Sequence, residues 1–302
     1  MMRRLLHYYC WGLNIASELA CPEMIEGAGA ADVHVVIGRT PESLPDADYR
    51  GVRFEVTDDQ FLLRVDKVAR YHAVKGERIV VEPFPDALPE EVRLFLLGSG
   101  FGALLQQRGM VPMHASVIEM NGNAVMFCGV SAVGKSTLAA TFCMRGYRML
   151  ADDVCVVRID EWGRPVAVPG YPQFKLWGDA LKALRTDDTS RLTHARLGLE
   201  KYNLDAREQF CAAERPLKAV YFLTSSNESS FDLKRIQGKD KFIALFNCTY
   251  RIQFLDKLIN KSFHYRICTA IAQYADMVHL IRPDSPFVPE KIADLVEEDL
   301  LS

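Results

Sequence analysis

The ten residues from Cys128 to Thr137 constrain this chain more than any other stretch. They fit the pattern Gly-x-x-x-x-Gly-Lys-Ser/Thr, in which backbone N–H groups surround the phosphates of a nucleotide. Residues 124–128 before the loop form a short apolar run typical of a buried strand, and apolar residues after it recur at helical spacing as far as Gly146. A strand, a glycine-rich turn and a helix start, in this order, predict a phosphate site, because a helix N-terminus carries partial positive charge.

Each residue type in this loop suits one task. Gly129 and Gly134 allow backbone angles that other residues resist. Lys135 can place an ammonium group on the β- and γ-phosphates, and the Ser136 hydroxyl can bind Mg²⁺. The alternative is a glycine-rich turn that precedes a helix by chance. We expect a nucleotide to be bound by Gly129, Val130, Ser131, Ala132, Val133, Gly134, Lys135, Ser136 and Thr137.

Composition excludes several classes of partner. The 302 residues are enough for one large domain or two ordinary ones. A net charge of −3 gives no electrostatic case for binding nucleic acid or an anionic membrane, and no run of 18 apolar residues predicts a membrane span. The eight cysteines lack a C-x-x-C or metal-ligand spacing, which favours reduced, buried thiols. We therefore expect a cytoplasmic protein.

The chain divides into two parts by pattern. Residues 1–88 are predicted to form a small β-rich domain, with alternating or β-branched runs at 33–37, 51–56, 61–65 and 78–81 and a hairpin tip at Lys75-Gly76. A proline-rich joint over 83–89 leads to a second domain at 89–302, which contains the predicted phosphate loop.

The second domain is expected to begin with a helix at Pro89. The run Gly98-Ser99-Gly100-Phe101-Gly102 inside this helix imitates a dinucleotide-binding fingerprint. Its Gly-x-Gly-x-Gly spacing is wrong for that fingerprint, and no strand precedes it, so we interpret it as small residues that allow close helix packing. Further elements are predicted as a helix within 172–184, helices over 241–257 and 263–280, an acidic helix at the end of 286–302, and a strand over 217–224.

An acidic pair follows the phosphate-loop helix. Residues 147–153 have the pattern of a strand that ends in Asp152 and Asp153, and adjacent side chains on a strand face opposite ways. One carboxylate can then hold Mg²⁺ while the other accepts a proton or positions a nucleophile; the alternative is a solvated turn. His114 lies in a predicted hairpin, residues 111–118, that leads through a turn at 121–123 to the loop strand. On spacing alone, such a histidine is more often structural.

The chain resembles the catalytic domain of HPr kinase/phosphorylase in three segments, namely Met113-His114-Ala115-Ser116, the loop from Gly129 to Thr137, and Arg145-Gly146-Tyr147 with Ala151-Asp152-Asp153. It is still more similar to the HPr-kinase-like serine kinases of bacterial peptide-tailoring clusters, which include lasso-peptide kinases. That second similarity extends to residues 9–19, 108–109, 169–172 and 176–177. The block from His114 to Asp153 is its most specific part.

The resemblance implies a role for each matching residue. Lys135 would contact the phosphates of ATP, Ser136 would bind Mg²⁺, and Asp153 would lie near the metal. Asp152 would deprotonate the acceptor serine, and His114 would lie close to the transferred phosphate. The implied α/β fold is a P-loop kinase domain with the mixed sheet shared with phosphoenolpyruvate carboxykinase, added to the β-rich N-terminal domain.

One departure from the family concerns a basic residue. HPr kinases carry a Glu-Val-Arg-Gly-type signature after the acidic pair, and this chain has no copy. The nearest basic stretch, residues 196–202, offers Arg196 or Lys201 to neutralise the moving phosphoryl group, although a solvated charged loop is an equal alternative. HPr recognition and the reverse, phosphate-driven reaction therefore do not follow from the resemblance.

The expected function is that of an ATP- and Mg²⁺-dependent serine kinase. Its expected partner is a peptide or small protein that carries a serine, with a lasso precursor peptide phosphorylated at or near its C-terminus as the first choice. A kinase for HPr or a small molecule, and a regulatory module that binds a nucleotide without transferring phosphate, are the alternatives. Because HPr kinases assemble into hexamers, a homo-oligomer is a further expectation.

Overall fold

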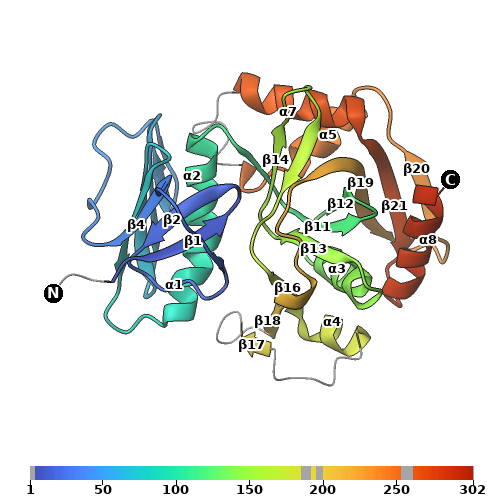
Figure 1. Ribbon diagram of the computed structural model, residues 1–302, viewed down its shortest axis with the longest axis horizontal. Coiled ribbons are helices and arrows are strands. Elements are labelled where there is room, and N and C mark those ends of the chain that lie inside the picture. The colour runs from blue at the N-terminus through green and yellow to red at the C-terminus, as the bar shows by residue number, and fades with distance from the viewer. Residues whose placement is uncertain (1–3, 185–191, 195–199, 253–260, 302) are drawn as a thin grey trace. The chain divides into compact units, whose positions relative to one another are not determined.

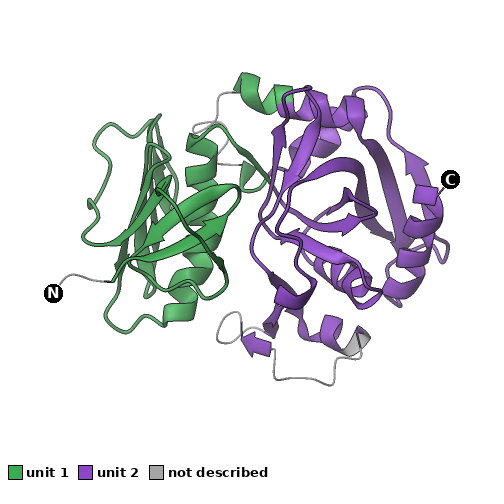
Figure 2. Cartoon of the chain, viewed as in Figure 1, with its two compact units in different colours: residues 1–112, 250–266 green, residues 113–249, 267–302 purple. Residues whose placement is uncertain are grey.

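The computed structural model describes residues 4–184, 192–194, 200–252 and 261–301, and the chain falls into two compact units (Figures 1 and 2). The N-terminal unit comprises residues 1–112 and 250–266. The second unit comprises residues 113–249 and 267–302, and we call it the P-loop unit after the phosphate loop that its sequence predicts. These units differ from the division expected at residue 88, because the helical segment after that residue is counted with the first sheet.

The N-terminal unit is built on a nine-stranded mixed sheet in the order β3-β1-β2-β4-β9-β8-β7-β6-β5. Its strands are β1 (Leu6–Cys10), β2 (Leu13–Ser17), β3 (Ile25–Glu26), β4 (Val33–Ile37), β5 (Tyr49–Arg50), β6 (Phe54–Val56), β7 (Gln60–Val65), β8 (Ala69–Val74) and β9 (Arg78–Pro83). Alternate residues of β8 are buried, as the alternating sequence requires. Lys75 and Gly76 both have positive φ, 53° and 67°, and they form the predicted hairpin tip between β8 and β9.

One continuous helical segment accompanies this sheet. It consists of α1 (Pro89–Phe95), the π-helical turn η1 (Leu96–Gly100) and α2 (Phe101–Gln107). A Cβ added at Gly98 would lie 3.0 Å from the Tyr250 hydroxyl, and one at Gly102 would lie 3.0 Å from the same ring. The glycine run therefore serves close packing, as predicted, and it does not form a nucleotide loop.

The P-loop unit is built on a second nine-stranded mixed sheet. It runs β10-β14-β15-β19-β12-β11-β13, with β21 added beside β19 and β20 beside β21. These strands are β10 (Val111–Met113), β11 (Ala115–Met120), β12 (Asn123–Cys128), β13 (Arg148–Asp152), β14 (Cys155–Ile159), β15 (Pro165–Val168), β19 (Arg215–Ser226), β20 (Asp232–Arg235) and β21 (Asp276–Pro283). Strands β12, β19 and β21 are parallel, so their carboxyl ends meet at the edge where the phosphate loop leaves β12.

A three-stranded antiparallel sheet, in the order β16-β18-β17, adds to this unit. Its strands are β16 (Gln173–Trp177), β17 (Leu192–His194) and β18 (Lys201–Asp205). The helices in the rest of the described chain are α3 (Lys135–Met144), α4 (Gly178–Ala183), the 3₁₀ turn η3 (Arg207–Gln209), α5 (Asp240–Asn247), α7 (Lys261–Tyr274) and α8 (Pro289–Leu301).

Helix α3 carries the loop into the hydrophobic core. The ring of Phe142 is fully buried and stacks on Phe127 of β12 with 5.5 Å between centroids, and Tyr147 meets its edge at 5.6 Å. Just after the helix, Arg145 forms ion pairs at 2.6 to 2.8 Å with three acids of α8, namely Glu290, Asp294 and Glu297. The carboxyl-terminal part of α3 is therefore fixed by the core and by α8 together.

Two predicted helices are wrong in part. Residues 172–184 form strand β16 followed by the short helix α4, and residues 263–280 form helix α7 followed by strand β21. Pairing with β18 stabilises β16, and pairing with β19 stabilises β21, and neither pairing is visible in a local pattern. The predicted helix over 241–257 holds for α5 as far as Asn247, while its residues 253–257 lie outside the described part.

The remaining sequence-based expectations concern cysteines and membranes. All eight cysteines are free, and all except the partly buried Cys143 are buried. Among the residues that the structure describes, no helix is long and apolar enough to cross a membrane.

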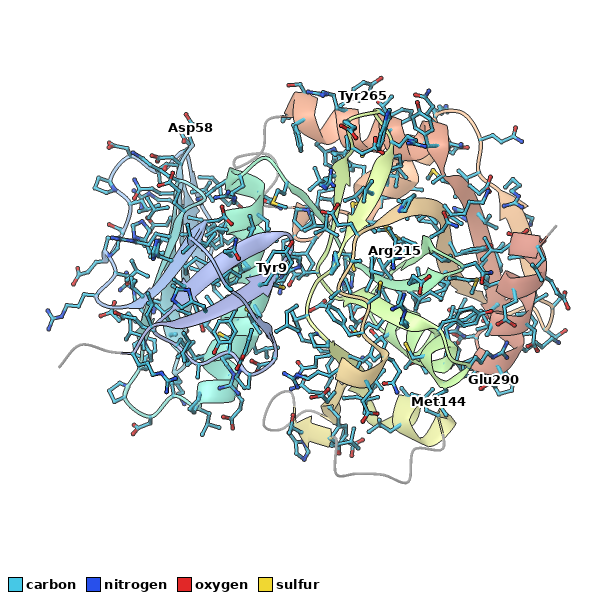
Figure 3. All side chains as sticks on the ribbon, in the orientation of Figure 1. Tyr9, Asp58, Met144, Arg215, Tyr265 and Glu290 are labelled. Carbon is cyan, nitrogen blue, oxygen red and sulfur yellow. The ribbon has the colours of Figure 1, made fainter. Side chains whose placement is uncertain are left out.

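Removal of the Phe142 ring tests the core that supports the loop. Phe142→Ala is expected to lower the free energy of unfolding by about 3–5 kcal/mol, because the cavity cannot fully collapse around the lost ring. The matched control is Met144→Ala in the same helix, since Met144 is 61% exposed and should change stability by about 0.5 kcal/mol or less (Figure 3). Equilibrium urea unfolding measures both, and equal effects would contradict this packing.

Candidate functional site

The phosphate loop has the backbone that its sequence predicts. Strand β12 ends at Cys128 and α3 begins at Lys135, with Gly129 at φ 141° and Gly134 at φ 105°. A Cβ at Gly129 would lie 2.6 Å from the backbone oxygen of Leu223, so glycine is needed there for space as well as for conformation. Among the described residues, no side chain caps the N-terminus of α3, which leaves its first N–H groups directed at the loop.

Two residues from another part of the sequence contact the loop: Arg282 of β21 and Phe287, which follows that strand. Arg282 is buried and its guanidinium donates a hydrogen bond to the Val133 carbonyl at 3.1 Å. The guanidinium carbon lies 4.7 Å from the centroid of the Phe287 ring. A Cβ at Gly134 would come within 2.6 Å of that ring, so the second loop glycine also makes room for a neighbour.

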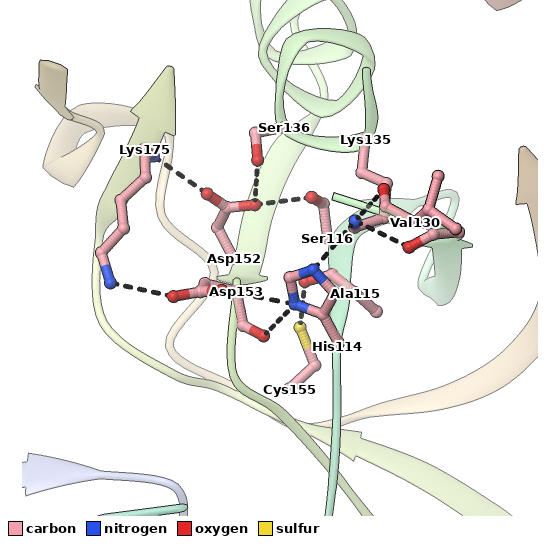
Figure 4. Close-up of polar contacts among 11 residues, drawn as sticks. His114, Ala115, Ser116, Val130, Lys135, Ser136, Asp152, Asp153, Cys155 and Lys175 are labelled. Carbon is pink, nitrogen blue, oxygen red and sulfur yellow. Dashed lines mark hydrogen bonds and ion pairs between the residues drawn. The ribbon is translucent and has the colours of Figure 1, made fainter. Parts of the chain in front are cut away.

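Lys135 is buried within the loop that it belongs to. Its ammonium group donates to the carbonyls of Gly129 and Val130 at 2.9 and 3.0 Å, and it lies 3.1 Å from His114 Nε2 (Figure 4). Burial lowers the pKa of Lys135, while the charges of Asp152 and Asp153 act in the opposite direction. The ammonium group of Lys135 is therefore hydrogen-bonded to backbone carbonyls, which phosphate oxygens can replace as acceptors.

The acidic pair lies at a sharp turn. Strand β13 ends at Asp152, and the Val154 N–H bonds the Asp152 carbonyl at 2.9 Å, which closes a three-residue turn around Asp153. Asp153 has φ 69°, a conformation that few non-glycine residues adopt and that occurs at turns and at functional sites. The turn separates the two carboxylates, as the sequence predicts for adjacent acids.

Asp152 is a buried acceptor of several hydrogen bonds. The register of β11 and β13 places Ser116 opposite Asp152, and the Ser116 hydroxyl donates to Oδ1 at 2.5 Å. The Ser136 hydroxyl donates to the same oxygen at 2.8 Å, and the Lys175 N–H donates to Oδ2 at 3.0 Å. Burial raises the pKa of Asp152 although these bonds oppose it, and the charge of Asp153 adds to the increase.

Asp153 has the opposite electrostatic surroundings. Its Oδ2 is 3.0 Å from the Lys175 ammonium group, and its Oδ1 is 3.3 Å from His114 Nδ1. Burial acts to raise the pKa of Asp153, but Lys175 and His114 outweigh burial and hold that pKa well below its usual value. The two acids therefore differ in charge state as well as in direction: Asp153 stays ionised, whereas Asp152 binds a proton more readily.

These contacts join residues that are far apart in the sequence. Lys135 touches His114, His114 touches Asp153, and Asp153 touches Lys175, so one continuous polar network crosses the site (Figure 4). The structure thus brings His114, Lys135, Ser136 and both acids together, as the sequence predicts for a shared site.

Lys175 is a site residue that the sequence pattern did not reveal. It is buried, 8% exposed, and it lies on β16 between Phe174 and Leu176, which face the hydrophobic core. The pattern apolar–lysine–apolar over 174–176 was a signal of strand alternation, with the lysine on the opposite face. The prediction of a helix over this stretch hid that signal.

A cavity of about 510 Å³ opens on these groups. The phosphate loop, the acidic pair and His114 line it, together with Lys175 and Lys201. The Lys201 ammonium lies 5.5 Å from the centroid of the Trp177 ring. Of the two basic residues expected from the sequence, Lys201 lines the cavity, and Arg196 lies outside the described residues.

The oxygen atoms beside the phosphate loop fit the requirements of Mg²⁺. This ion prefers oxygen ligands and is commonly bound by one or two protein groups together with phosphates. The Ser136 hydroxyl, which lies 2.8 Å from Asp152 Oδ1, and the carboxylate of Asp153 both line the cavity. Within the described ranges, no group of three or more His, Cys, Asp or Glu side chains is placed to hold a metal ion by itself. The residues present are therefore suited to a metal that arrives with a nucleotide.

Comparison with known proteins finds a similar fold and no family assignment. No family model matches the chain, and no curated protein matches it. Among solved structures, the HPr(Ser) kinase/phosphatase from Coxiella burnetii is similar over 63% of this chain and 96% of its own, with 12% sequence identity and a TM-score of 0.36. A similarity at this level assigns neither a family nor a function, so any functional assignment depends on the geometry of the site.

Gly129→Ala tests whether the loop backbone forms a phosphate site. The added methyl group collides with the Leu223 carbonyl, so the loop must shift, and the affinity for inorganic pyrophosphate should fall by at least about tenfold, or 1.4 kcal/mol. Isothermal titration calorimetry measures that change.

Gly163→Ala is the control for the backbone conformation alone. Gly163 also has positive φ, 80°, but an added Cβ there meets nothing within 4 Å. This variant is expected to lose about 1–2 kcal/mol of stability without losing affinity for pyrophosphate. Equal affinities for pyrophosphate in both variants would contradict the assignment of the loop.

Proposed function

We propose that the P-loop unit is a kinase that transfers the γ-phosphoryl group of ATP to a serine hydroxyl. The observation that supports this proposal is the convergence of three features on one cavity: an open helix N-terminus, a loop lysine and two acids with opposite pKa shifts. Phosphoryl transfer needs positioning and charge neutralisation more than covalent chemistry, and these groups supply both.

The nucleotide would occupy the phosphate loop. The N–H groups at the start of α3 would bind the phosphate oxygens, and Lys135 would exchange the carbonyls of Gly129 and Val130 for the β- and γ-phosphates. His114 would keep the lysine at the reacting end, since the two side chains are in contact at 3.1 Å. This exchange costs little because each partner given up is a neutral carbonyl oxygen.

Asp152 is the proposed proton acceptor. The acceptor hydroxyl attacks the γ-phosphorus, the bond to the β,γ-bridging oxygen breaks, the serine proton passes to Asp152, and ADP leaves. Asp152 lines the cavity, and its Oδ1 accepts hydrogen bonds from Ser116 and Ser136, so a substrate hydroxyl would take the place of Ser136 once Ser136 turns to another partner. Burial raises the pKa of Asp152, which favours this role over that of Asp153.

Mg²⁺ would supply charge neutralisation on the β- and γ-phosphates when bound. Ser136 is the proposed ligand from the phosphate loop, and Asp153, which stays ionised, is the proposed acid near the metal. Ser136 contacts Asp152 in the structure, so the division of roles between the two acids is open to a direct test.

The proposed acceptor is a peptide or small protein that carries a serine, with a lasso precursor peptide as the first candidate. This choice rests on the resemblance of residues 9–19, 108–109, 169–172 and 176–177 to the peptide-tailoring kinases. HPr and small hydroxyl compounds are the other acceptors to compare, and a module that binds ATP without transferring phosphate is the alternative to catalysis.

Asp152→Asn tests the proposed transfer. The protein is incubated with ATP, Mg²⁺ and a panel of serine-containing lasso precursor peptides, HPr and free serine, and mass spectrometry detects an added phosphate. Asp152→Asn is expected to lower the transfer rate by about 10²–10⁴-fold, because the proton acceptor is lost, with little change in the affinity for ATP.

Two further variants complete this experiment. Asp153→Asn is expected to weaken the dependence of nucleotide affinity on Mg²⁺, and Asp232→Asn, on the partly exposed strand β20, should leave both quantities unchanged. If Asp152→Asn transferred phosphate at the rate of the original protein, Asp152 would be excluded as the proton acceptor. If the original protein bound ATP but formed no phosphorylated product, the result would favour a regulatory module that binds ATP without transferring phosphate.

A further inference from the structure

We propose that Lys175 is a second phosphate-binding cation, which together with Lys135 forms a subsite for the terminal phosphoryl group of the nucleotide. The inference rests on the proposed function and gives it a residue that neither the phosphate-loop pattern nor the acidic pair indicates. The chain lacks the Glu-Val-Arg-Gly-type signature, which leaves one basic group of the site unassigned. The inference places that basic group on β16 and not in the stretch 196–202.

Lys175 is fixed by its backbone as well as by its side chain. In the described part of the chain, strand β16 pairs with one strand, β18, and its Lys175 N–H donates to Asp152 Oδ2 at 3.0 Å. The ammonium group of the same residue is 3.0 Å from Asp153 Oδ2 (Figure 4). One residue therefore binds both members of the acidic pair, and its charged end is located relative to both of them.

The burial of this lysine requires an explanation. Lysine is almost never buried unless its charge is paired, because removal of an ammonium group from water is unfavourable. The pairing with Asp153 satisfies that requirement, yet the side chain still lines the cavity shared with the phosphate loop. An ammonium group has three donor hydrogens, so a carboxylate and a phosphate oxygen can be bound at the same time.

The charges around the cavity favour the same role. The two acids are balanced by Lys135 and Lys175, which approach from different elements, α3 and β16. A nucleotide triphosphate adds several negative charges at this point, and the group in transfer moves from the loop toward the acids. A cation beside Asp153, such as Lys175 at 3.0 Å, would stabilise negative charge at the end of that movement.

Lys201 is less suited to this task. Lys201 lies on β18, where it pairs with Trp177 of β16, two residues after Lys175. Its ammonium group is placed over the Trp177 ring. Lys175, in contrast, contacts the acidic pair directly. The geometry therefore points to Lys175 as the cation of the reacting end.

The test compares a triphosphate with a diphosphate. Isothermal titration calorimetry measures the affinities for AMP-PNP, a non-hydrolysable ATP analogue, and for ADP, both with Mg²⁺. Lys175→Met is expected to lower the preference for AMP-PNP over ADP by about tenfold or more, because the terminal phosphate loses a charged hydrogen-bond donor. Lys175→Arg, which keeps the charge, should restore most of that preference.

Two controls separate this effect from misfolding. Lys234→Met removes an exposed lysine that pairs with Asp232 at 2.7 Å, and it should leave the preference unchanged. The double variant Asp153→Asn/Lys175→Met removes both charges of the buried pair, so no carboxylate is left unpaired, and circular dichroism checks its fold. Its preference for AMP-PNP should be lower than that of Asp153→Asn alone, which isolates the contribution of Lys175.

The outcomes distinguish this inference from the proposed function. If the original protein binds neither nucleotide, the proposed function and the inference both fail. If it binds nucleotides and transfers phosphate, but shows no preference for AMP-PNP or keeps that preference in Lys175→Met, only the inference is overturned. An equal weakening of AMP-PNP and ADP in Lys175→Met would also overturn it, because a structural lysine would affect both.

Discussion

The carboxylate of Asp152 is the interaction on which the site depends. It accepts hydrogen bonds from β11 through Ser116, from α3 through Ser136 and from β16 through the Lys175 N–H. Three elements that are separated in the sequence are thereby joined at one buried group. Such a group is unfavourable in the interior unless it is fully hydrogen-bonded, so the elements must assemble together for the carboxylate to be accommodated.

A second level of organisation comes from the neighbouring acid. Asp153 faces away from the hydroxyl groups and toward two nitrogen-bearing side chains, Lys175 and His114. Adjacent residues at the end of one strand thus obtain different charge states from their surroundings alone. A site that must accept a proton at one atom and hold a cation at another can be built in this way from two identical side chains.

The part of the site that could be predicted from the sequence is the part with local signals. The phosphate loop, the hairpin that brings in His114 and the strand that ends in the acids each depend on consecutive residues. Lys175 could not be found in this way, because Leu176, Ala180 and Leu184 also fit a helical stripe, and only pairing with a distant strand decides for β16. The boundary at Ala275 was missed for a similar reason, since no glycine or proline separates α7 from β21.

The left-handed backbone at Asp153 has a consequence for how the site comes into being. A conformation of this kind costs about 1–3 kcal/mol and persists only where the surroundings enforce it. An isolated peptide with this sequence would therefore not present its acids as the folded chain does. Catalytic activity then depends on the complete tertiary structure. Local unfolding of the sheets would abolish the activity before the chain unfolds globally.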